Sequence, residues 1–130
     1  MHDGPMPLPL TRSVHAAGLT DGQLVTLLVG IGLTLIEVHA AGKCHGSLHP
    51  FHVELDERGR PMLRPSDAPD GWAQRDDVLA VLRLGTALAR PEGSMATELR
   101  AYASGGELAL DHVVPWLLRL AEPVPLPTCG

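Results

Sequence analysis

The stretch "CHGSLHPFH" places one cysteine and three histidines within nine residues: Cys44, His45, His49 and His52. Thiolate and imidazole are the ligands that zinc prefers, so a small zinc site is one hypothesis for this cluster. No second cysteine pair and no HExxH pattern accompanies it to fix a metal geometry. Pro50 and its neighbours also favour a loop. The alternative is that His45 is a structural histidine.

Ser47 lies between two of these histidines, and several aspartates follow later in the chain: Asp67, Asp76 and Asp77. Serine, histidine and aspartate together are the components of a hydrolase triad. No nucleophile elbow and no loop suited to an oxyanion hole accompanies Ser47. We therefore interpret this set as a coincidence of common residue types.

The element before the cluster is an apolar stretch from Leu24 to Gly42. Its uncharged run before Glu37 is about 13 residues long, below the roughly 18 expected of a membrane span. The polar residues and one glycine recur three or four apart, which places them on one helical face: Gln23, Thr26, Gly30, Thr34 and Glu37. Thr20 with Gln23 forms a capping box, and Gly42 suits the C′ position. We expect a core helix that ends near residue 41, with a membrane helix as the alternative.

The segments after the cluster predict a small β-hairpin followed by three helices. Residues 51–55 alternate apolar and polar, residues 56–59 have turn chemistry, and residues 60–64 supply the return strand. The next helix is expected to open at Asp76 or Asp77, both good N-caps. Two more helices are expected over about 95–103 and 107–121, the second interrupted or started by Pro115.

The composition bounds the class of protein. The chain has 130 residues, which suggests one domain, and its 45% hydrophobic content argues against disorder. Its net charge of −5 without a basic block disfavours nucleic-acid binding. Its two cysteines do not form a disulfide framework, and the N-terminus lacks signal-peptide features. We expect a cytoplasmic protein with an irregular lead (1–19, with a helical turn near 11–17), a helical domain (20–121) and a Pro-rich tail (122–130).

Three motifs in order carry a resemblance to a known family: "LIEVHAAGKCHGSLHP", "VELDERGRPML" and "DDVLAVL". Their order and spacing are similar to the C-terminal lobe of eukaryotic-type protein kinases, of the kind common in actinobacteria. There they would be the helix before the catalytic loop, the hairpin after it and the central buried helix. The resemblance implies a mainly α fold with one small β-hairpin, the helical kinase C-lobe without its N-lobe.

The resemblance also implies which positions of this chain correspond to the catalytic-loop residues of a kinase. His45 keeps the first residue of the His-Arg-Asp motif, whereas Gly46 replaces its arginine. Ser47 replaces the aspartate that accepts the substrate proton, His49 replaces a lysine, and His52 replaces the magnesium-binding asparagine. These are degenerate positions, and none of them is assigned a catalytic role.

For Asp77, the resemblance implies a structural role beside that of His45. The equivalent aspartate holds the catalytic-loop backbone by hydrogen bonds. The alternative is that Asp77, or Asp76, only caps its helix. No Asp-Phe-Gly triplet stands near residues 65–67, where the magnesium-binding triplet would fall.

The functional expectation is a catalytically inactive, pseudokinase-like module that binds protein as a scaffold or regulator. Only about 20 residues precede the long helix, too few for a five-stranded N-lobe with its phosphate-binding loop and lysine. We expect no cofactor, no ATP binding, no nucleic-acid or membrane binding, and either a protein partner or a homo-oligomer. A zinc protein built on residues 44–52 and a pseudokinase that still binds nucleotide remain the alternatives.

Overall fold

The fold comes from a computed structural model, which describes residues 8–9, 19–46, 48, 53–55, 61–63, 68–90 and 93–124. Within these residues it contains four α-helices: α2 (Asp21–Ala40), α3 (Gln74–Leu88), α4 (Met95–Gly105) and α5 (Leu110–Leu120). Three short strands accompany them: β1 (Leu8–Pro9), β2 (Val53–Leu55) and β3 (Pro61–Leu63). The predicted mainly helical fold with one small hairpin is confirmed. The expected helical turn at 11–17 lies outside the described residues, as does most of the Pro-rich tail.

Helix α2 begins and ends at the residues that its local sequence predicts. At the start, Thr20 Oγ1 accepts from the Gln23 N–H at 3.2 Å and Gln23 Oε1 accepts from the Thr20 N–H at 3.1 Å. At the end, Gly42 has φ 78° and donates its N–H to the His39 carbonyl at 2.9 Å. The Lys43 N–H reaches the Val38 carbonyl at 3.1 Å, which completes a Schellman motif.

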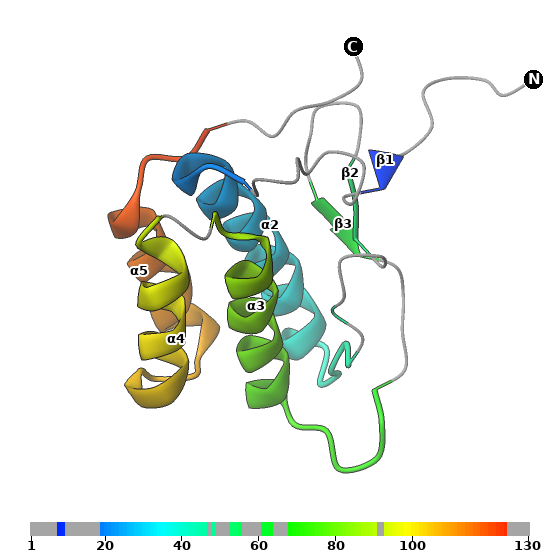
Figure 1. Cartoon of the computed structure of the whole chain (residues 1–130). Helices are drawn as coiled ribbons and strands as arrows, with labels where there is room; N and C mark the ends of the chain where they lie inside the picture. The colour runs from blue at the N-terminus through cyan, green and yellow to red at the C-terminus, as the bar shows by residue number, and fades with distance from the viewer. Residues whose placement is uncertain are drawn as a thin grey trace, which may run out of the picture.

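Helix α2 occupies the middle of the molecule. Figure 1 shows it behind α3, with α4 and α5 to one side and the small sheet to the other, and α2 contacts α3, α5 and β3. Within the described residues it is the one helix long and apolar enough to cross a membrane. Its inner residues, such as Leu24, Leu28 and Ile31, are nevertheless fully buried against the neighbouring elements. This packing is that of the predicted core helix.

The sheet has the order β1-β2-β3, and both pairs are antiparallel. The β2–β3 hairpin pairs Val53 with Leu63 and Leu55 with Pro61, within the predicted strands 51–55 and 60–64. Residues 51, 52, 60 and 64 of that prediction lie outside the described residues. Strand β1 was not expected, because residues 1–19 were predicted to be an irregular lead. Its two residues pair with β2 through the backbone, so the sheet gains an edge that side-chain periodicity does not predict.

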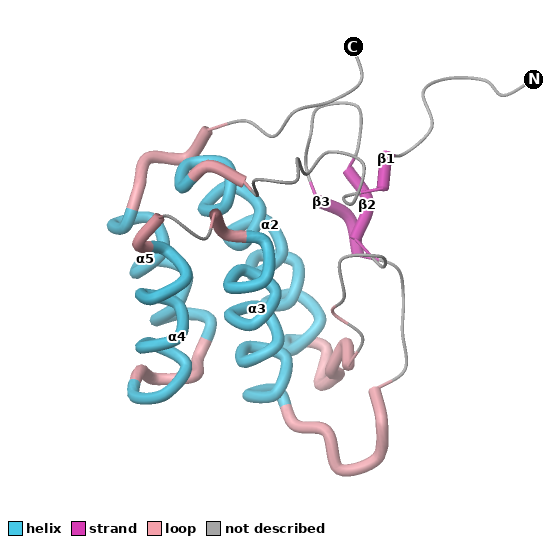
Figure 2. The backbone as a smooth tube through the Cα atoms, viewed as in Figure 1, coloured by secondary structure: helices cyan, strands magenta, loops and turns pink. Residues whose placement is uncertain are grey.

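Helix α3 corrects the predicted helix start. It begins at Gln74 with Ala73 as N-cap, so Asp76 and Asp77 lie inside the first turns, and neither residue is the N-cap. Asp76 still caps the helix from within, since its Oδ2 accepts from the Ala73 N–H at 2.8 Å. Figure 2 shows α3 leaving the loop that contains residues 68–73.

Helices α4 and α5 lie close to their predicted places. Helix α4 extends to Gly105, and α5 begins at Leu110, three residues later than expected. Pro115 lies inside α5. The Pro115 side chain is exposed, on the outer side of the helix, where its missing N–H can be replaced by water.

Candidate functional site

The carboxylate of Asp77 is the centre of the site, and it accepts four hydrogen bonds. Oδ2 accepts from the His45 backbone N–H at 2.7 Å and lies 2.9 Å from Nε2 of His39. Oδ1 accepts from the Gly46 backbone N–H and from Nε1 of Trp72, both at 2.9 Å. The Asp77 side chain is fully buried, and each oxygen has two donors. We call these five residues the Asp77 cluster.

Three elements bring the cluster together. Asp77 lies in the first turn of α3 and His39 in the last turn of α2, and the Gln74 side chain donates to the His39 carbonyl at 3.1 Å. The loop residue Gly46 has φ 75°, and a Cβ there would lie 2.5 Å from the Ala68 Cα. A glycine is therefore required at this position, where the kinase motif has arginine.

The hydrogen bonds decide the charge of Asp77. Burial raises the pKa of the Asp77 carboxyl, but the bonds from His39, His45, Gly46 and Trp72 together outweigh burial and hold the pKa below its usual value. The group is therefore an ionised acceptor at neutral pH. Because an ionised carboxylate only accepts, Nε2 of His39 carries the proton in that bond. With two donors on each oxygen, Asp77 is fully occupied by the protein itself.

Cys44 is adjacent to the cluster, and its environment disfavours a reactive thiolate. Sγ lies 3.8 Å from the Trp72 carbonyl. Burial, followed by the negative charges of Asp77 and Asp76, raises the pKa of the Cys44 thiol. The thiol therefore remains protonated near neutral pH, which is the wrong form for a nucleophile.

The structure describes only part of the predicted loop site. His45 is buried and donates its backbone N–H to Asp77, and the resemblance implied structural roles for both residues. Ser47, His49 and His52 lie outside the described residues, as does Asp67. Among the residues that are described, no group of three histidine, cysteine, aspartate or glutamate side chains could hold a metal ion.

Two members of the cluster were not singled out from the sequence. His39 had a signal, because it lies in the motif "LIEVHAAGKCHGSLHP" that carries the kinase resemblance. Trp72 had none, since its bond to Asp77 depends on how the loop before α3 folds back over five residues. The alternative of Asp77 as a simple N-cap is wrong, because Ala73 is the N-cap of α3.

A second region differs in character, on the outer side of α2. Val29, Leu33 and Ile36 are spaced four and three residues apart, so they share one helical face. Leu33 is 54% exposed and Ile36 is 39% exposed. Beside Val29 and Leu33, a hollow of about 360 Å³ is bounded by Pro61 of β3 and by Pro123. We call Val29, Leu33 and Ile36 the outer α2 face.

Comparison with known proteins gives a partial kinase relationship. A segment of 45 residues, 35% of this chain, is 40% identical to serine/threonine-protein kinase 16 of the mouse. The matched segment spans 15% of that protein's length. No family model matches the chain. The similarity supports a loose kinase-like relation for part of the chain and gives no information on activity.

Proposed function

We propose that this chain is a catalytically inactive, kinase-like module that binds another protein and serves as a scaffold or regulator. One observation carries the proposal: Asp77 is fully occupied in holding the backbone of His45 and Gly46. The frame of a catalytic loop is thus held in place, while the next residue in the sequence is Ser47 in place of a carboxylate.

The chemistry of phosphoryl transfer supports the inactive part of the proposal. The reaction needs a group to orient or deprotonate the attacking hydroxyl, and metal ions between the phosphates. The Ser47 hydroxyl is not a base near neutral pH, and the imidazoles of His49 and His52 are poor ligands for magnesium, which prefers oxygen. The four donors on Asp77 leave that carboxylate no free position for either task.

The outer α2 face supports the binding part of the proposal. Leu33 and Ile36 expose large apolar side chains next to each other on a helix whose inner residues, such as Leu28 and Ile31, are buried. Contiguous exposed apolar side chains beside a hollow are typical of surfaces that meet another protein. We therefore assign partner binding, by a second copy or by another protein, to this face.

The proposed lack of kinase activity is tested with ATP and magnesium. We expect no transfer of radiolabelled phosphate to the chain or to a generic protein substrate, and no rise in melting temperature when ATP and Mg²⁺ are added together. A clear rise in melting temperature that depends on both would contradict the proposal in favour of a pseudokinase that still binds nucleotide.

The proposed partner binding by the outer α2 face is tested by sedimentation velocity over a range of concentrations, and by capture of partners on immobilised protein. Leu33→Ser should abolish the association. Leu118→Ser is the matched control, because Leu118 is 45% exposed but lies on α5. A protein that is monomeric at every concentration and captures no partner, or one whose association both variants reduce equally, would contradict the assignment.

A further inference from the structure

A second hollow lies where three helices meet, and Ile36 is the one residue that it shares with the outer α2 face. It has a volume of about 420 Å³ and is bounded by the C-terminal end of α2, the first turn of α3 and residues 108–111 at the start of α5. Pockets for small molecules usually measure about 300–1,000 Å³, so this one suits a ligand at the small end of that range.

Several residues in the wall of the hollow have aliphatic side chains. Ile36, Val78 and Leu110 contribute aliphatic side chains, of which Val78 and Leu110 are buried and Ile36 is 39% exposed. An apolar body placed against these three side chains would remove the exposed part of Ile36 from water. The hollow therefore favours a ligand with an aliphatic or aromatic portion.

Two polar side chains of the wall are already occupied by the protein. Nε2 of His39 is bonded to Asp77, and the Gln74 side chain donates to the His39 carbonyl. Both residues line the hollow, and His39 also belongs to the Asp77 cluster. They are therefore not the groups that would select a ligand.

Two charged side chains remain, one of each sign: Arg75 in the first turn of α3 and Asp111 in the first turn of α5. Within the described part of the chain, neither makes an ion pair or side-chain hydrogen bond. A cation is unfavourable in the first turn of a helix, because the helix dipole is positive there. Arg75 therefore stands where its own helix does not stabilise it, and an anionic group in the hollow would do so.

We propose that this hollow binds a small zwitterion with an apolar body, the chemistry of a free hydrophobic amino acid. Its carboxylate pairs with the Arg75 guanidinium, its ammonium group pairs with the Asp111 carboxylate, and its side chain lies against Val78 and Leu110. A charge-assisted pair to each of the two charged groups gives selectivity over molecules that carry only one of the two charges.

The experiment is a titration of the whole ¹⁵N-labelled chain with L-phenylalanine, followed by the backbone amide signals of Ile36, Val78 and Leu110. We expect saturable shifts of these signals. Two probes each remove one charge: 3-phenylpropanoate lacks the ammonium group and 2-phenylethylamine lacks the carboxylate. Each should bind at least about fivefold more weakly than L-phenylalanine.

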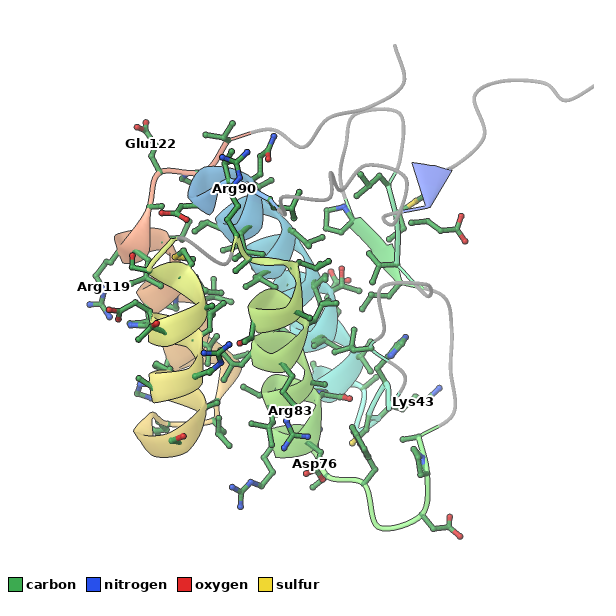
Figure 3. The ribbon with its side chains drawn as sticks, in the orientation of Figure 1. Lys43, Asp76, Arg83, Arg90, Arg119 and Glu122 are labelled. Atoms are coloured by element: carbon green, nitrogen blue, oxygen red, sulfur yellow. The ribbon has the colours of Figure 1, made fainter. Side chains whose placement is uncertain are left out.

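Substitutions test whether Arg75 and Asp111 each bind one charged group of the ligand. Arg75→Gln should weaken the binding of L-phenylalanine by about fivefold or more, and Asp111→Asn should do the same. Arg83→Gln is the matched control, because Arg83 is an exposed arginine of the same helix that does not line the hollow and should leave binding unchanged (Figure 3).

Three results would overturn the proposal. The first is the absence of saturable shifts even at about 10 mM L-phenylalanine. The second is binding of 3-phenylpropanoate as tight as that of L-phenylalanine, which would make the hollow a site for apolar anions and leave Asp111 without a role. The third is an equal loss of affinity in Arg83→Gln and Arg75→Gln.

Discussion

The Asp77 cluster and the outer α2 face both include residues of helix α2, and they differ in how many partners their side chains find within the chain. In the cluster, each oxygen of the buried Asp77 carboxylate accepts two hydrogen bonds. The donors come from α2, the loop of residues 44–46 and Trp72. On the outer α2 face, Leu33 and Ile36 remain exposed although their helix is the central one of the fold.

This difference distinguishes residues that stabilise the fold from residues that are available to bind a partner. A polar group that finds all its partners within the chain stabilises the fold and has little left for a ligand. An apolar side chain that the chain covers only in part contributes less to folding and gains by further burial against a partner. We therefore expect substitutions in the cluster to change stability, and substitutions on the outer α2 face to change association.

The largest effect is expected at Asp77. Asp77→Ala leaves four donors without their acceptor, so it should lower the free energy of unfolding by about 3–5 kcal/mol. Asp76→Ala is the neighbouring control, since it removes only the bond to the Ala73 N–H and should cost about 0.5–1 kcal/mol. Urea denaturation followed by far-UV circular dichroism measures both. Equal costs for the two aspartates would mean that the cluster is no more than a helix cap.

The two faces of α2 give the next largest contrast. Leu28 is fully buried on the inner face, and Leu28→Ala should cost about 2–5 kcal/mol through lost contacts and the cavity that remains. Leu33→Ala changes the same side chain on the outer face and should stay within about 0.5 kcal/mol of the parent. Thermal unfolding of the two variants measures the contrast. A cost above about 2 kcal/mol for Leu33→Ala would show that this face serves the fold.

A smaller effect is expected on lowering the pH. The pKa of the Asp77 carboxyl is depressed in the folded chain, so its stabilising contribution is complete above the unfolded value of about 3.9 and is lost as the pH falls through the folded value. The difference in unfolding free energy between the parent and Asp77→Asn should therefore shrink below about pH 4, by at most about 1.4 kcal/mol per pH unit. Urea denaturation between pH 7 and pH 3 measures it. A gap that widens toward acid would reverse the sign that the hydrogen bonds imply.

The smallest effect concerns Cys44. Because the pKa of its thiol is raised, Cys44 should react with iodoacetamide several-fold more slowly in the folded chain than in the urea-unfolded chain near pH 7.5. The measurement uses Cys129→Ser, so that one thiol remains. Faster alkylation in the folded state would indicate an activated thiol and revive the metal or catalytic interpretation of residues 44–52.

Much of α2 was predictable because its signals are local. Thr20, Gln23 and Gly42 act on backbone groups within six residues, so the capping box and the Schellman motif follow from spacing alone. The start of α3 was missed for a related reason. Ala73 offers no capping side chain, and Asp76 caps the helix from its third residue, so the strongest capping residue is not at the boundary.

The site was less predictable because its bonds link distant parts of the chain. The resemblance implied that Asp77 holds the loop backbone, and the structure has hydrogen bonds from His45 and Gly46 to that carboxylate. The bond from Trp72 depends on the fold of the loop before α3. Strand β1 likewise pairs with a segment more than 40 residues away through backbone groups, which carry no side-chain signal.

Site-specific photo-crosslinking from the outer α2 face tests the central claim most directly. A photoreactive amino acid replaces Leu33 in one sample and Leu118 in a matched sample, and both proteins are irradiated in extract from the cells that make the chain. The account predicts one defined adduct, with a second copy or with another protein, from position 33 and none from position 118. No adduct from position 33, or the same adducts from both positions, would contradict the claim that this face binds protein.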